Sequence, residues 1–71
     1  NNVHREEIQF LILKSSYALA VNSITAMVSD RLNDALDAFF VFNDNYPNSK
    51  YIKEAIKISE NIKKKLNNKN N

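Results

Sequence analysis

Hydrophobic side chains recur at helical spacing along the first third of the chain, over about residues 3–28. One stripe contains Phe10, Leu13, Tyr17, Val21, Ile24 and Met27/Val28, and a second contains Ile8, Leu11, Ile12 and Leu19. A helix that is apolar on two sides must be covered on both. We therefore predict an inner helix whose second stripe is an interface.

A second helix is predicted over about residues 31–43, because its apolar positions again follow helical spacing. These positions are Leu32, Ala35, Leu36, Phe39 and Phe42. Either Ser29 or Asp30 can cap the start of this helix with a side-chain oxygen. The first break in the chain is therefore expected at these two residues.

A third helix is predicted over about residues 50–66, after a break around Pro47. Proline removes a backbone donor and pushes the preceding residue out of the helical region, so the second helix must end before it. Asn48 or Ser49 can cap the helix that follows. Residues 67–71 contain no apolar side chain and are expected to form a disordered tail. The predicted fold class is all-α.

The composition excludes several classes of chemistry. The chain has 71 residues, with no glycine, no cysteine and one histidine. Phosphate loops and dinucleotide fingerprints need glycine, and thiolate metal sites need cysteine. His4 has no acid and nucleophile near it in sequence with which to act as a general base. We predict no cofactor, no metal site and no catalysis.

Charge is unevenly distributed, although the net charge is only +2. Anions predominate up to Pro47, and lysines predominate after it at positions 50, 53, 57, 63, 64, 65 and 69. A lysine-rich end is commonly a solvated surface, but it could also follow a phosphate backbone. A small basic nucleic-acid-binding domain is therefore the alternative function. Scarce arginine and the interrupting Glu54 and Glu60 weigh against it, so no nucleic acid is expected as a partner.

Part of the chain matches the tetratricopeptide pattern. The matching positions are Phe10, Leu13 and Tyr17, followed by Ala35, Phe39, Phe42 and Pro47. In this pattern a small residue lets two helices cross closely and aromatic residues fill the space beside it. Lys14 stands where glycine is usual, and the interval between the two halves is about nine residues too long. We expect a tetratricopeptide-like helix pair plus one further packing helix, with a longer first helix or a longer loop.

Two stretches, residues 4–17 (HREEIQFLILKSSY) and 46–55 (YPNSKYIKEA), resemble the C-terminal repeats of the BamD family. These are outer-membrane lipoproteins of the β-barrel assembly machinery, and the chain is most similar to the version of Bacteroidetes-type bacteria. The resemblance implies a non-catalytic scaffold at the periplasmic face of the outer membrane. Its implied partners are the periplasmic domains of the barrel-forming subunit and unfolded outer-membrane proteins.

The same resemblance implies membrane contact only through a lipid anchor on an N-terminal cysteine, which this chain lacks. We therefore expect the chain to be a C-terminal piece of a longer protein. The second stripe of the first helix, Ile8, Leu11, Ile12 and Leu19, would then face a preceding repeat. The isolated chain is accordingly expected to self-associate through this stripe or to melt at a low temperature.

Overall fold

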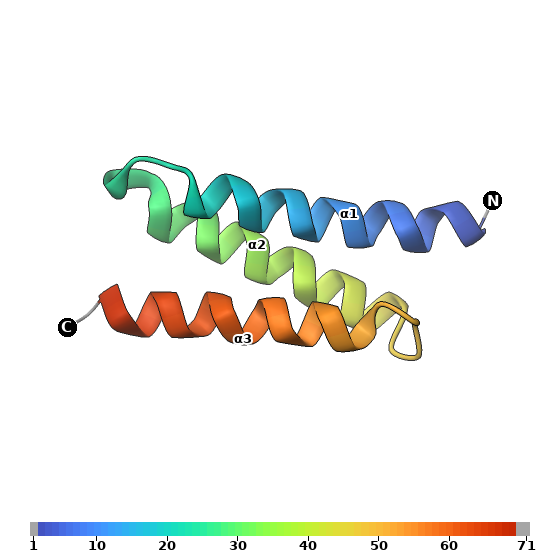
Figure 1. Cartoon of the computed structure of the whole chain (residues 1–71). Coiled ribbons are helices and arrows are strands. Elements are labelled where there is room, and N and C mark those ends of the chain that lie inside the picture. Colours follow the sequence, from blue (N-terminus) through green and yellow to red (C-terminus); the bar gives the residue numbers. More distant parts are fainter. Residues whose placement is uncertain (1, 70–71) are drawn as a thin grey trace.

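The computed structural model describes the backbone of residues 2–69 and the side chains of residues 4–67. The chain forms three helices, α1 (Asn2–Val21), α2 (Thr25–Asn45) and α3 (Ile52–Lys69), as Figure 1 shows. There is no strand within the described range. The predicted all-α class is therefore confirmed.

The three helices run alternately up and down. In Figure 1, α1 and α3 point the same way, and α2 runs antiparallel to both as it crosses from the end of α1 to the start of α3. Contacts are most extensive between α1 and α2, fewer between α2 and α3, and fewest between α1 and α3. The expected antiparallel pair with a third helix packed on both is confirmed.

Side chains from all three helices form one hydrophobic core. The buried apolar residues are Phe10, Leu13 and Ala20 from α1, Leu32, Ala35, Phe39 and Phe42 from α2, and Ala55, Ile58 and Ile62 from α3. On α2 these positions recur every three or four residues, and on α1 they do so once the partly buried Tyr17 is included, so each helix turns one stripe inward. The ring of Phe10 lies between those of Tyr51, stacked at 4.6 Å, and Phe42, at 5.8 Å. Aromatic packing thus joins α1, α2 and the start of α3.

The first break in the chain lies at residues 22–24 and not at 29–30, where the sequence predicted it. The side chains of Asn22 and Ser23 donate hydrogen bonds to carbonyl oxygens four residues earlier, at 2.8 and 2.6 Å. Such local bonds compete with the backbone ladder and end α1. Ser29 and Asp30 lie inside α2 and cap nothing.

The predicted helix bounds 3–28 and 31–43 are therefore wrong at the junction. Nine residues assigned to the end of the first helix or to the break, from position 22 to position 30, belong to the loop or to α2. The extra length in the tetratricopeptide pattern was expected in the first helix or the loop. It is found in α2, which has 21 residues.

The second break follows the chemistry of Pro47. The N–H of Tyr46 donates to the carbonyl of Phe42 at 2.8 Å, and Tyr46 then leaves the helical region with φ of −137°. A residue before proline is biased away from the helical region, so the helix ends here. The predicted position of this break is confirmed.

The end of the chain departs from the prediction. Helix α3 continues through Lys69, so residues 67–69 are helical and do not form the expected disordered tail. Asparagine has weak helix propensity and lysine good propensity, but extending an existing helix by a few residues does not incur the cost of nucleation. The last two residues of the predicted tail, 70–71, lie outside the described range.

Candidate protein-binding face

The four residues predicted to form an interface are all exposed. Between 49% and 54% of the surface of each remains accessible in Ile8, Leu11, Ile12 and Leu19. We call this set the α1 apolar face. Single exposed apolar residues are ordinary on protein surfaces, but several on one helix indicate a surface that can bind another protein.

The α1 apolar face lies opposite the side of α1 that packs in the core. Residues 10, 13, 17 and 20 point toward α2 and α3, and they are buried or partly buried. At 100° per residue, positions 8, 12 and 19 lie on the far side of the helix. Neither α2 nor α3 covers this side, although Ile12 and Leu19 lie at its edge beside α2. The prediction that only one side of the first helix is covered within the chain is therefore confirmed.

Two open grooves continue this face onto α2. One, of about 250 Å³, is lined by Gln9 and Ile12 of α1 and by Ala38 and Val41 of α2. The other, of about 310 Å³, is lined by Ser16, Leu19, Met27, Asp30, Arg31 and Asp34. The contribution of Met27 and Val41 was not predicted. Both are exposed apolar residues on α2, and only the rotation of α2 against α1 brings them beside the α1 apolar face.

The residues predicted to pack the helix pair are mostly buried. Phe10, Leu13, Ala35, Phe39 and Phe42 are in the core, and Tyr17 is partly buried against it. Pro47 differs, because it is exposed in the loop between α2 and α3. Its role there is to stop α2, and it adds little to the packing.

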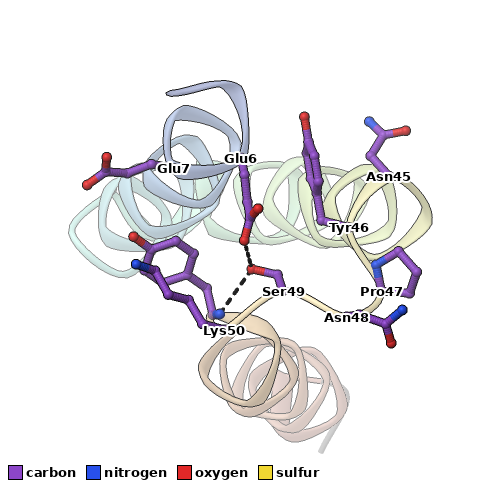
Figure 2. A pocket seen from close by; sticks show the side chains of 9 residues that line it. Glu6, Glu7, Asn45, Tyr46, Pro47, Asn48, Ser49 and Lys50 are labelled. Carbon is purple, nitrogen blue, oxygen red and sulfur yellow. Dashed lines mark hydrogen bonds between the residues drawn. The ribbon is translucent and has the colours of Figure 1, made fainter. Parts of the chain in front are cut away.

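A cleft of about 540 Å³ lies where the N-terminal part of α1 meets the loop between α2 and α3 (Figure 2). Ser49 is its buried polar side chain, and its Oγ donates to the carboxylate of Glu6. The same Oγ accepts the N–H of Tyr51 at 3.0 Å, which caps the first turn leading into α3. The sequence predicted this cap but not its link to α1. Because Ser49 bonds both to Glu6 and to the N–H of Tyr51, the polar groups of this cleft join α1 to the start of α3.

Lys14 has a role that the repeat pattern did not predict. Its Nζ lies 3.6 Å from a carboxylate oxygen of Glu54 on α3 and 5.5 Å from the centre of the Phe10 ring. Where a glycine would allow the backbones to approach, Lys14 instead bridges the edges of α1 and α3. The pair is exposed, so its contribution to stability is at most about 1 kcal/mol.

Ser49→Ala is expected to lower the free energy of unfolding by about 1–2 kcal/mol. The change removes the cap of α3 and the hydrogen bond to Glu6. Urea unfolding followed by far-UV circular dichroism measures the loss. The exposed neighbour Asn48 supplies the control, since Asn48→Ala is expected to cost far less. Equal losses from the two variants would contradict the assigned role of Ser49.

The lysines of α3 with described side chains are exposed. They occupy positions 53, 57, 63, 64 and 65. Glu60 is exposed among them, and Glu54 is engaged by Lys14. The alternative function, nucleic-acid binding, would depend on this lysine-rich surface of α3.

Comparison with protein-family models, with curated proteins and with solved structures finds no match for this chain. Within the described range, no helix has the length and apolar character needed to cross a bilayer. The same range contains no group of three or more His, Cys, Asp or Glu side chains arranged to hold a metal ion.

Proposed function

We propose that this chain is part of a non-catalytic helical-repeat scaffold whose role is to bind other proteins. We further propose that the scaffold is an outer-membrane β-barrel assembly lipoprotein of the BamD type. Its partners would be the periplasmic domains of the barrel-forming subunit and unfolded outer-membrane proteins, at the periplasmic face of the outer membrane.

The observation that carries the proposal is the α1 apolar face. Its four large aliphatic side chains, Ile8, Leu11, Ile12 and Leu19, are each about half exposed on one helix. Leaving so much apolar surface in water costs free energy that burial against a partner would recover. The function class most consistent with such a surface is protein binding.

The arrangement of the helices supports the repeat part of the proposal. Helices α1 and α3 run parallel with α2 antiparallel between them in sequence, as successive helices do in a repeat array. In such arrays each helix pair is covered by its neighbours, so a free apolar face on α1 is the expected surface for the next contact. The resemblance of residues 4–17 and 46–55 to BamD supplies the choice of partners.

The direct test is a titration of the chain with the purified periplasmic domains of a barrel-forming subunit, followed by calorimetry. We expect saturable binding that Leu11→Gln/Leu19→Gln weakens by at least about tenfold. Glutamine is a good helix former, so the variant should remain folded. The control is Ile24→Gln/Ile56→Gln, which removes two other exposed aliphatic side chains outside the α1 apolar face.

Two results would contradict the proposal. One is a failure of the folded chain to bind these domains. The other is strong, salt-dependent retention on DNA that is lost when the lysines of α3 are neutralised. The second result would favour the alternative, a small basic nucleic-acid-binding domain.

A further inference from the structure

The surface beside the α1 apolar face carries a row of negative charge. Asp30, Asp34 and Asp37 are exposed and follow one another along α2 at spacings of four and three residues. Residues at these spacings lie on one side of a helix. Asp30 and Asp34 line the same groove as Leu19 and Met27, which places this part of the row beside apolar side chains.

Apolar side chains from both helices accompany this row. Ile12 and Val41 line one groove, and Leu19 and Met27 line the other. We call these four residues, bordered by Asp30, Asp34 and Asp37, the α1/α2 face. It extends from Met27 to Val41, or about 21 Å along α2 at 1.5 Å per residue. This length suits a helix of about four turns.

Charge restricts what can occupy the α1/α2 face. Helix α2 carries four aspartates and one arginine, Arg31, which lines the groove beside Asp30 and Asp34, so its net charge is negative. If two copies paired this face with their α2 helices antiparallel, their aspartate rows would come together in an apolar interface, and like charges there are strongly unfavourable. The basic helix of a second copy, α3, buries its apolar stripe in its own core and leaves little beyond Ile56 exposed. A second copy therefore matches either the apolar or the charged part of the face, but not both.

We propose that the α1/α2 face binds an amphipathic helix of a partner protein whose apolar stripe is bordered by lysine or arginine. The stripe would fill the two grooves, and the basic border would meet the aspartate row. This inference rests on the proposed function, because it specifies the kind of helix that the scaffold binds. Electrostatic complementarity of this kind contributes mainly to specificity and association rate.

The test uses two labelled synthetic peptides of about 18 residues, long enough to cover the face. Both carry the same leucine stripe, bordered by lysine in one and by glutamate in the other, and both are confirmed helical by circular dichroism. Fluorescence anisotropy should show the lysine peptide binding at least about tenfold more tightly than the glutamate peptide. Raising the salt from about 50 to 500 mM should reduce the difference, because salt screens exposed charges.

Variants separate the apolar and charged parts of the α1/α2 face. Ile12→Gln/Leu19→Gln should abolish binding of the lysine peptide. Asp34→Asn/Asp37→Asn should keep binding but lose most of the preference for lysine over glutamate. The matched control Glu7→Gln/Glu60→Gln removes the same charge from exposed positions elsewhere and should retain the preference.

Several results would overturn the inference. Equal affinity for both peptides would remove the role of charge, and binding that survives Ile12→Gln/Leu19→Gln would remove the role of the grooves. Failure to bind either peptide, or a dimer in sedimentation that Ile12→Gln/Leu19→Gln dissociates, would also refute it. If the chain still binds the periplasmic domains of the barrel-forming subunit, only this inference fails. If the lysine peptide binds and those domains do not, only the choice of partner in the proposed function fails.

Discussion

Phe42→Ala is expected to lower the free energy of unfolding by about 3–5 kcal/mol, because the change leaves a cavity in the middle of the core. Phe42 is fully buried and is the largest side chain to be so, and it contacts the rings of Phe10 and Tyr46. A chain of 71 residues has a total stability of about 4–11 kcal/mol at typical values per residue. The loss is therefore a large fraction of the whole.

Phe40 provides the matched control for this prediction. It lies two residues away on the same helix, but it is 47% exposed. Phe40→Ala removes the same side chain without opening a cavity and should cost less than about 1 kcal/mol. Thermal unfolding should show a fall in Tm of more than about 12 °C for the Phe42 variant and a small change for the Phe40 variant. Similar shifts for both would mean that Phe42 is not the centre of the core.

The helical periodicity predicted many of the buried residues, because burial is what imposes that periodicity, but Val21, Ile24 and Met27 of the predicted first stripe are exposed. Phe10, Leu13, Ala35 and Phe42 were all assigned to helix packing from their spacing, and all are buried. The exposed second stripe on α1 was also predicted. A helix that is apolar on two sides has more apolar surface than two neighbours on one side can cover.

The first break could not be located from capping chemistry alone. Ser29 and Asp30 can cap a helix as well as Asn22 and Ser23 can end one, so both sites were chemically reasonable. The choice depends on packing. With a turn at residues 22–24, Leu32 and Ala35 of α2 are buried, and the stripe on α1 ends at Ala20. Which residues are buried depends on contacts between the helices, so the position of the break cannot be found from the residues around it alone.

The acidic border of the α1/α2 face was missed for a related reason. The spacing of Asp30, Asp34 and Asp37 can be read from the sequence. The position of Asp30 and Asp34 beside Leu19 depends on how α2 is rotated about its axis. Similarly, the bond between Glu6 and Ser49 joins residues 43 positions apart. Such contacts follow from the packed structure and not from the spacing of residues within one helix.

Ala35→Leu is expected to destabilise the chain by about 1–3 kcal/mol through overpacking. Ala35 is completely buried on α2, among the other residues of the core. Three additional carbon atoms there must displace neighbouring side chains or move the helices apart. Leucine has nearly the helix propensity of alanine, so the loss reports packing and not the formation of α2.

Ala38→Leu is the control for this packing prediction. Ala38 is only partly buried and lines the open groove beside Ile12 and Val41, into which a larger side chain can extend. Its cost should be below about 0.5 kcal/mol, as at most surface positions. The two variants have the same composition, so a comparison of their urea midpoints isolates the position. Equal midpoints would contradict the assignment of Ala35 to the site where α2 needs a small residue.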